Sequence, residues 1–332
     1  MSNQGIWVVA EQQGDALEST TRELLGKARE LGNQSGQAVH VLLIGSACQG
    51  AAQGLGDMGA DQVWVADHGD LATYRAEAFG AVAAHLLAQH QPAVALFSAT
   101  SAGRDMAAYA AARLKTGVAP DANGILAEGG QFKVTRPIFG GNVLATLATS
   151  GGTALITVLP KAFEPAAGGA GKAGTINAVA LEPNLLAART KVKAFVEELQ
   201  SGKINLTDAE IVVAGGRGVG GADKFGIIEE LARALGAAVG ASRAVTDAGW
   251  RPANEQIGQT GVTVKPKLYI AAGISGAVQH WVGMKEAGYI VAINTDAEAP
   301  IMKQADLAIV GDLFKVIPEM VKEISAAKGV AA

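Results

Sequence analysis

The chain of 332 residues is long enough for about two domains, and 49% hydrophobic residues can supply a core for each. Its formal net charge of −4 argues against a nucleic-acid partner, because a general nucleic-acid binder needs a basic surface to neutralise phosphates. The single cysteine, Cys48, excludes an internal disulfide, a cysteine-ligated iron–sulfur cluster and a cysteine zinc site.

Residues 1–5 lack the basic region and long apolar run of a signal peptide, and no 18-residue apolar stretch follows that could span a bilayer. We therefore expect no membrane insertion and a cytoplasmic location, with a mature organelle protein as the alternative. The four histidines of the first half, at 40, 68, 85 and 90, have no spacing that suggests a metal site.

Short apolar runs alternate with helix-like segments in the first part of the chain. The runs predict strands at 5–10, 39–44, 62–65 and 93–97, and the segments between them predict helices at 19–31, 71–89 and 106–114. Gly32 is expected to end the first of these helices. This alternation is typical of a mostly parallel sheet that is covered by helices on both faces.

The pattern then changes to strands with short connections. Residues 131–136, 142–149 and 153–159 are joined by glycine pairs too short to hold a crossover helix, which predicts three antiparallel strands. Residues 175–181 and 190–195 are expected to be further strands. The polar stretch 197–208 suggests a boundary between an N-terminal domain, 1–200, and a C-terminal domain, 201–332.

The second half opens with an apolar strand that runs into a glycine loop over residues 210–221. An amphipathic helix is expected at 224–235 and a closing helix at 313–324. Four more short strands are expected at 237–239, 268–271, 290–293 and 307–309. The fold class is therefore α/β with two domains, each with a largely parallel sheet flanked by helices: antiparallel strands are added to the first, and the second is doubly wound.

Ligands of open parallel sheets bind at the carboxyl ends of the strands, so the loops that follow the strands are the candidates for a site. Six polar, glycine-rich loops meet this condition: 215–221, 240–243, 256–261, 271–280, 292–300 and 310–313. Each loop alone also fits a structural role, such as a tight turn, an Arg243–Asp247 ion pair or a helix cap at Asp312. Together they predict a cleft for an extended ligand.

The ordered motifs of the second half resemble the electron-transfer flavoprotein alpha subunit. They are Gly215-Gly-Arg-Gly218, Gly240-Ala-Ser-Arg243, Asp247-Ala-Gly-Trp250, Gly258-Gln-Thr-Gly261, Pro266-Lys-Leu-Tyr269, Gly273-Ile-Ser-Gly-Ala-Val-Gln-His280, Ile293-Asn294, Ala299-Pro300 and Gly311-Asp312. The resemblance is close through residues 210–320. The first half resembles this family in layout only.

The resemblance implies a heterodimer that carries electrons rather than an enzyme that converts a substrate. The alpha subunit would hold FAD in its C-terminal domain, and its N-terminal domain would contact a beta subunit. Electrons would come from flavin dehydrogenases, such as the acyl-CoA dehydrogenases of fatty acid beta-oxidation, and pass to a quinone oxidoreductase or another acceptor. Membership of an electron-bifurcating complex is left open.

The resemblance also implies which residues touch FAD: Arg217, Ser242, Arg243, Ile257, Gly258, Gln259, Thr260, Ser275, Gly276, Ala277, Val278, Gln279, His280, Asn294, Asp312 and Leu313. Reduced flavin is negative near N1 and the C2 carbonyl, so Arg243 and His280 are expected to stabilise that charge. The Thr260 hydroxyl is expected to reach N5. The amides after Ser275 suit the pyrophosphate, and Asn294 and Asp312 suit the adenosine end.

Two other functions are weighed against this one. A regulatory or scaffolding module that binds adenine nucleotides without redox chemistry would have the same glycine-rich cleft. A nicotinamide dehydrogenase is disfavoured, because no acidic residue follows the glycine loop at the position that reads the ribose: Glu229 and Glu230 lie within the first helix instead.

Overall fold

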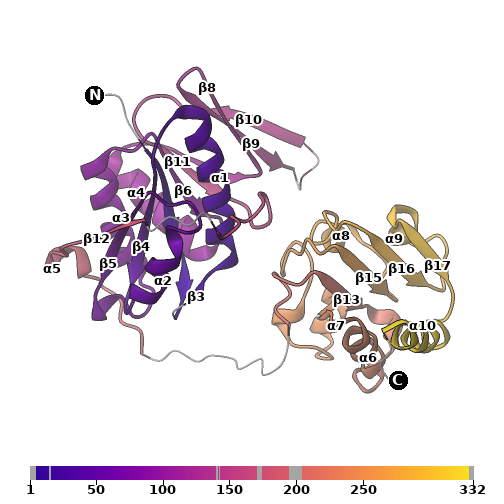
Figure 1. Cartoon of the computed structure of the whole chain (residues 1–332). Coiled ribbons are helices and arrows are strands. Elements are labelled where there is room, and N and C mark those ends of the chain that lie inside the picture. The colour runs from indigo at the N-terminus through magenta and orange to yellow at the C-terminus, as the bar shows by residue number, and fades with distance from the viewer. Residues whose placement is uncertain are drawn as a thin grey trace. The chain divides into compact units, whose positions relative to one another are not determined.

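The computed structural model describes residues 5–14, 16–139, 141, 143–169, 174–193 and 204–328. It divides the chain into two compact units, Met1–Val196 and Glu197–Ala332, and each is described here by itself (Figure 1). Both units are built on a parallel sheet with helices on its faces, which confirms the predicted α/β class.

The first unit has a seven-stranded sheet in which every neighbouring pair is parallel. From one edge to the other, the strands are β12 (Thr175–Ala178), β5 (Gln62–Asp67), β4 (Val39–Gly45), β1 (Ile6–Ala10), β6 (Val94–Ser98), β11 (Ala154–Val158) and β7 (Val118–Ala122). The strands β1, β4, β6 and β11 read as nearly continuous apolar runs because both of their faces are buried.

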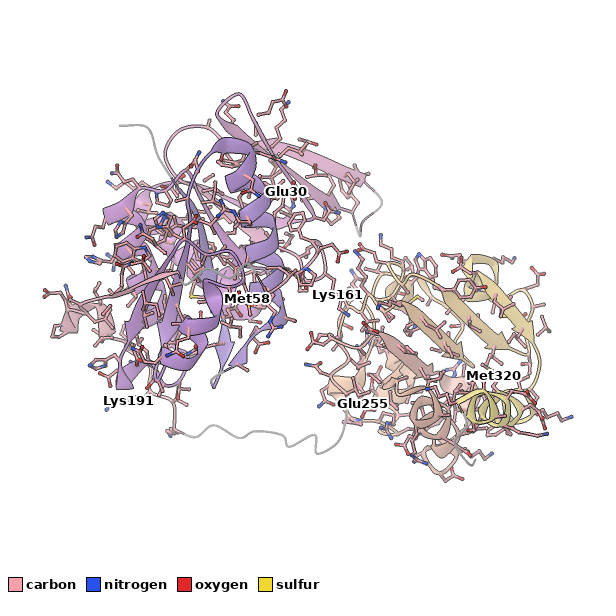
Figure 2. All side chains as sticks on the ribbon, in the orientation of Figure 1. Glu30, Met58, Lys161, Lys191, Glu255 and Met320 are labelled. Atoms are coloured by element: carbon pink, nitrogen blue, oxygen red, sulfur yellow. The ribbon has the colours of Figure 1, made fainter. Side chains whose placement is uncertain are left out.

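Helices cover both faces of this sheet. Along β1, Ile6 and Val8 face one core with α1 (Ser19–Ser35) and α2 (Gln49–Leu55). Trp7 and Val9 face the other core with α3 (Ala76–His90), α4 (Ser101–Leu114) and the short α5 (Pro183–Leu186). Met58 packs at the side of the first of these cores (Figure 2).

An antiparallel sheet of three strands is added to the first unit. Its order is β10 (Val143–Ala148), β9 (Gln131–Ile138) and β8 (Gly124–Glu128), with β9 in the middle. Side chains of one face, such as Phe132 and Val134, join the core of the large sheet. A two-residue pair, β2 (Gln12–Gln13) and β3 (Ala16–Leu17), follows β1.

Several predictions for the first unit are wrong in detail. The expected third antiparallel strand is β11, which instead lies parallel between β6 and β7 with all five residues buried. Helix α1 passes through Gly32 and ends before Gly36, which adopts a positive φ of 67° and donates to the Gly32 carbonyl. Helix α3 begins at Ala76 rather than at 71.

Other elements of the first unit were not predicted or were placed wrongly. Strands β7 and β8 and helix α2 have no counterpart in the predicted elements. Of the expected strand 190–195, residues 190–193 have no strand geometry and residues 194 and 195 lie outside the described residues.

The second unit has a five-stranded parallel sheet, and all its predicted strands are confirmed. Its order is β14 (Ala238–Ala241), β13 (Ile211–Gly215), β15 (Leu268–Ala272), β16 (Ile290–Asn294) and β17 (Leu307–Val310). One face packs against α6 (Gly226–Leu235), α7 (Arg243–Asp247) and α10 (Leu313–Lys328), where Met320 lies (Figure 2). The other face packs against α9 (Pro300–Gln304) and the segment that holds the one-turn α8 (Val278–Trp281).

Within the described residues, no helix is both long enough and apolar enough to cross a membrane.

Candidate functional site

The strand order of the second unit defines where its site lies. The chain leaves β13, forms β14 on one side, and returns to form β15 on the other side of β13. The loops after β13 and β15 therefore run in opposite directions and leave a crevice between them, which is the usual ligand position in such sheets.

A cleft of about 670 Å³ lies at this crevice, within the range of about 300–1,000 Å³ that is typical of small-molecule sites. Loops from four of the five strands contribute to it: those after β13, β14, β15 and β16. Its lining consists of Arg217, Gly218, Ser242, Arg243, Ala244, Asp247, Gly273, Ile274, Ser275, Ala277, Gln279, His280, Asn294, Asp296 and Ala299.

Three glycines let the loops after β13 and β15 touch at the base of the cleft. The amide of Gly216 donates to Ala272 O at 2.8 Å, and the amide of Gly218 donates to Gly273 O at 3.0 Å. A Cβ atom on Gly218 would lie 2.8 Å from the Gly273 Cα, and Gly273 itself has a φ of +64°. Only glycine fits at these positions, because the two backbones are in direct contact.

The polar side chains of the cleft include one that lacks a partner. The Ser242 Oγ is buried and makes no hydrogen bond within the described structure. Arg243, two-thirds exposed, pairs with Asp247 at 3.2 Å. The side chain of Asn294 donates through Nδ2 to Ile274 O at 2.9 Å and accepts at Oδ1 from the backbone N–H of Asp296. These two bonds fix the Asn294 side chain at the rim.

The structure brings half of the sixteen predicted site residues to the cleft. Those that line it are Arg217, Ser242, Arg243, Ser275, Ala277, Gln279, His280 and Asn294. Those that do not line it are Ile257, Gly258, Gln259, Thr260, Gly276, Val278, Asp312 and Leu313.

The predicted loop 257–260 does not line the cleft but is bonded to a segment that does. The Gly258 amide donates to Val262 O, and the Gln259 amide donates to Gln279 O at 2.7 Å, so the loop is joined to the segment that lines the cleft. Thr260 is exposed, and its hydroxyl accepts from Gln256 Nε2 at 3.0 Å. Ile257 is buried in the core of this face.

The remaining four predicted residues have structural surroundings of their own. Asp312 Oδ1 accepts from the Phe314 amide and so caps α10, the structural role that its position also suggested. Leu313 is buried in the core beside α6. Gly276 packs against Ile301, while Val278 is exposed at the start of α8.

His280 is buried and both of its ring nitrogens are occupied. Its Nδ1 lies 3.0 Å from Ile257 O, and its Nε2 lies 2.9 Å from Tyr269 Oη. Burial lowers the pKa of His280 to about 4, with the contact to Ile257 opposing that shift. In this arrangement, the imidazole is neutral at physiological pH.

Seven lining residues were not predicted as site residues: Gly218, Ala244, Asp247, Gly273, Ile274, Asp296 and Ala299. Most of them are neighbours of predicted residues within the same loops. The signal that could have found Gly218 and Gly273 is their place at the ends of two adjacent strands, where close backbone approach requires glycine.

The equivalent crevice of the first sheet, between β1 and β6, is closed by the chain itself. Thr100 Oγ1 donates to the Glu11 carboxylate at 2.7 Å, and burial raises the pKa of Glu11. A Cβ atom on Gly103 would lie 2.0 Å from the Ser98 carbonyl oxygen, so the first turn of α4 sits directly on the end of β6. The open cleft of the second unit is therefore the stronger candidate.

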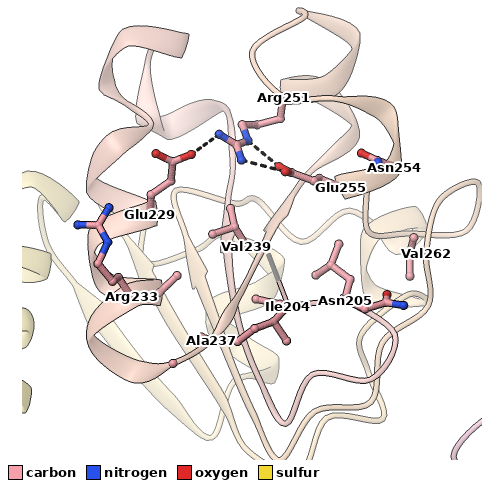
Figure 3. Close-up of a pocket in the computed structure, with 14 residues that line it drawn as sticks. Ile204, Asn205, Glu229, Arg233, Ala237, Val239, Arg251, Asn254, Glu255 and Val262 are labelled. Carbon is pink, nitrogen blue, oxygen red and sulfur yellow. Dashed lines mark hydrogen bonds and ion pairs between the residues drawn. The ribbon is translucent and has the colours of Figure 1, made fainter. Parts of the chain in front are cut away.

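A second cavity of the second unit, about 420 Å³, lies along the edge strand β14 rather than at the carboxyl ends of the strands (Figure 3). The Arg251 guanidinium points between Glu229 and Glu255 and donates to both carboxylates, including a 2.9 Å bond to Glu255. Because two carboxylates balance the charge of Arg251, it is not a free anion-binding group, and we assign this cluster a structural role.

A doubly wound sheet of order 2-1-3-4-5, with a glycine-lined cleft at its switch point, defines an α/β protein with a ligand site at the carboxyl ends of its strands. Comparison with known proteins identifies its kind. Residues 6–184 match the electron transfer flavoprotein domain, and residues 205–285 match the electron transfer flavoprotein FAD-binding domain. The chain belongs to the electron transfer flavoprotein family, as an alpha subunit, and its cofactor is FAD.

Curated relatives match the chain over nearly their whole length. The electron transfer flavoprotein subunit alpha of Thermoanaerobacterium thermosaccharolyticum is 44% identical over 97% of this chain and 98% of the relative. That of Bacillus subtilis is 39% identical over 95% and 96%. The acryloyl-CoA reductase electron transfer subunit beta of Anaerotignum propionicum is 37% identical over 97% and 96%.

The cleft fits FAD in size, in its glycine-lined base and in its unpartnered Ser242 hydroxyl. When bound, FAD supplies a group that accepts and gives up electrons one or two at a time. The residues that would hold it include Arg217 and Arg243 as cations and Ser242 and Asn294 as donors and acceptors, with Asp247 and Asp296 also lining the cleft. Alpha subunits of this family pair with a beta subunit.

Proposed function

We propose that this chain holds FAD in the switch-point cleft of its second unit and relays electrons as one half of a heterodimer. Electrons enter from flavin dehydrogenases, such as acyl-CoA dehydrogenases in fatty acid beta-oxidation, and leave to a quinone oxidoreductase or another acceptor. The proposal includes a cytoplasmic location and a division of labour between residues 1–200, which contact the beta subunit, and residues 201–332, which hold FAD.

The observation that carries the proposal is the cleft itself. It combines a base where three glycines bring two backbones into contact, the buried Ser242 hydroxyl without a partner, and two arginines at the rim. An extended ligand with anionic groups gives the hydroxyl a hydrogen-bond partner and pairs with the two arginines. Asn294, already oriented by Ile274, suits the adenosine end.

The name of one relative supports an acyl-CoA enzyme as a redox partner, although a reductase takes up electrons and so represents an acceptor rather than a donor. The protein from Anaerotignum propionicum is called an electron transfer subunit of acryloyl-CoA reductase, an enzyme whose name gives an acyl-CoA thioester as substrate. This favours a flavoenzyme of acyl-CoA metabolism as the partner of this chain as well.

The beta subunit is proposed to cover the outer antiparallel sheet. Strand β10 is the edge of that sheet, and its apolar side chains Val143, Leu144 and Leu147 are 47%, 62% and 37% exposed. A long apolar edge strand exposed on both faces promotes aggregation unless a partner covers it.

The decisive experiment is to purify the chain together with its beta subunit and record the visible absorbance of the complex, with the flavin counted per heterodimer. The proposal predicts a yellow complex that bleaches anaerobically when a reduced acyl-CoA dehydrogenase is added. One flavin indicates a simple carrier, and two indicate bifurcation. A complex that binds adenine nucleotides and takes up no flavin would favour the non-redox regulatory module instead.

A further inference from the structure

A buried hydrogen-bonded chain runs from the core to His280 at the wall of the cleft, and the role of its other members has not yet been considered. Tyr269 lies on β15, and its side chain is fully buried. Its hydroxyl lies 2.9 Å from His280 Nε2, and His280 Nδ1 lies 3.0 Å from the carbonyl oxygen of Ile257. Three segments are thereby joined through one imidazole: β15, α8 and the loop after the 3-10 turn Ala253–Glu255.

The carbonyl oxygen of Ile257 determines which ring nitrogen of His280 carries the hydrogen. A carbonyl oxygen only accepts, so His280 Nδ1 carries a hydrogen and donates to Ile257 O. In the neutral ring, Nε2 then has a lone pair and accepts from the Tyr269 hydroxyl. Every polar atom of the two side chains is satisfied in this one arrangement.

The alternative states of the ring leave a buried group unpaired. If His280 were an imidazolium, its Nε2–H would donate to Tyr269, and the Tyr269 hydrogen would need another acceptor. The Tyr269 hydroxyl makes no other hydrogen bond within the described structure, and Tyr269 is fully buried from solvent. The opposite neutral tautomer would place two lone pairs against each other at Ile257.

We propose that Tyr269 is a positioning residue, which holds His280 as a neutral imidazole protonated on Nδ1 beside the FAD site. This inference rests on the proposed function and refines it: the positive charge that favours reduced flavin comes from the arginines of the rim and not from His280. His280 contributes a fixed, uncharged ring whose orientation is set from behind.

The charged groups nearest to the site do not change this assignment. Those of the cleft come from three loops and are balanced in number: Arg217 after β13, Arg243 and Asp247 in α7, and Asp296 after β16. Arg243 and Asp247 pair with each other, and none of the four is bonded to the His280 ring.

The test reads the tautomer directly in the heterodimer loaded with FAD. The alpha subunit is labelled with ¹⁵N-histidine, and the His280 signals are assigned by their loss in His280→Gln. We expect Nδ1 to be the protonated nitrogen and Nε2 to be unprotonated from about pH 8 to about pH 5.5. A signal with Nε2 protonated, or a titration above pH 6, would overturn the proposal.

A variant provides the second measurement. Tyr269→Phe removes the hydroxyl and keeps the buried ring, so His280 Nε2 loses its donor. We expect a mixed tautomer, a titration moved toward the ordinary histidine range, and a flavin potential that becomes pH-dependent in that range. The control, Tyr289→Phe, removes a hydroxyl from the exposed Tyr289 of the same unit and should change none of these readings. An unaltered tautomer in Tyr269→Phe would contradict the positioning role.

The two proposals fail in different ways. Flavin absorbance per heterodimer tests whether the cleft holds FAD, whereas the ¹⁵N signals test the state of His280 with or without the cofactor. A colourless complex with the expected tautomer would remove the electron-carrier role and leave the hydrogen-bonded chain intact. A yellow complex with a charged His280 would do the reverse.

Discussion

We propose that Arg243 is the side chain through which the cleft most directly affects a bound flavin. It stands in the first turn of α7, lines the cleft, and pairs with the exposed Asp247 at 3.2 Å. An ion pair this exposed is weak, so Arg243 can turn toward an anionic ligand at little cost. The charge of reduced flavin near N1 and the C2 carbonyl is such a ligand.

Arg243→Ala is therefore expected to lower the reduction potential of FAD while the fold is kept. Loss of a charge-assisted contact should change the one-electron equilibrium by on the order of tenfold. Spectroelectrochemical titration of the heterodimer measures this. Arg243→Lys retains the charge and should fall between the two, and a potential that stays unchanged in Arg243→Ala would exclude Arg243 as a source of the stabilisation.

The sequence motifs predicted which loops meet at the cleft better than they predicted which side chains of those loops line it. The loops of the cleft were predicted because polar and glycine residues follow each apolar run, and the order of parallel strands then brings those loops together. They could not show which side chain of a loop points inward. Thr260 is turned toward Gln256, and Asp312 toward the first turn of α10, because each finds a nearby amide to bond.

At the scale of elements, the contact between the ends of β13 and β15 decides whether the cleft exists. Gly273 has a φ of +64°, and a Cβ atom there would lie 2.9 Å from the Gly218 Cα. Gly273→Ala should separate the two strand ends, reduce the FAD bound per alpha subunit, and cost about 1–3 kcal/mol of stability. Flavin content and thermal unfolding measure the two effects.

Gly226→Ala is the matched control for that substitution. Gly226 opens α6, has no positive φ, and has open space where a Cβ would lie. Alanine favours a helix over glycine, so this variant should keep its flavin and be slightly more stable. Equal behaviour of the two variants would mean that the contact at Gly273 does not shape the cleft.

The second sheet was predicted more completely than the first for a physical reason. Each of its strands is a short apolar run followed by a turn, which makes the strand easy to recognise in the sequence. The order of its strands in the sheet differs from their order in the chain only at the switch point. In the first unit, β11 follows the antiparallel strands in sequence but belongs to the large sheet, because its five buried residues pack on both faces. Short connections therefore predicted the wrong partner. Strand β7, Val118–Ala122, contains Pro120 and Asp121. Both residue types are uncommon in strands, so the sequence did not predict a strand there.

For the whole molecule, an aromatic and histidine cluster predicts how stability depends on pH. Trp7 stacks on His40 with ring centres 5.3 Å apart, and Trp64 lies 4.3 Å from His90. Burial lowers the pKa of both histidines, and the proximity of His90 lowers that of His40 further. The folded chain therefore takes up these protons at lower pH than the unfolded chain, and stability is lost as pH falls below the ordinary histidine pKa of about 6.5.

Urea unfolding at about pH 7.5 and about pH 5.5 measures that loss, whose limit is about 1.4 kcal/mol per pH unit for each proton taken up. His90→Leu should reduce the difference between the two conditions. His90 Nε2 is buried and makes no hydrogen bond within the described structure, so an apolar side chain replaces it without an orphaned partner. His68→Gln changes an exposed histidine outside this cluster, and an equal reduction of the difference by that variant would contradict the assignment to the buried cluster.

The exposed apolar side chains of β10 allow a test of how the chain assembles with a beta subunit. Leu144 on β10 is 62% exposed, and its neighbours Val143 and Leu147 on the opposite face are exposed too, so no side of this strand is buried within its own unit. Leu144→Arg should leave the isolated chain folded, because an exposed side chain carries little of its stability. It should weaken the heterodimer by at least tenfold, since a charge placed in an apolar contact is desolvated without a partner.

Ile176→Arg makes the same change on β12, at the far edge of the large sheet, where Ile176 is 42% exposed. Titration of the beta subunit against each variant, followed by analytical ultracentrifugation, separates a specific contact from a general effect of added charge. Weakening by Leu144→Arg alone assigns β10 to the interface. Equal affinities for both variants and the unaltered chain would require another surface of this chain to hold the beta subunit and another reason for the exposed apolar strand.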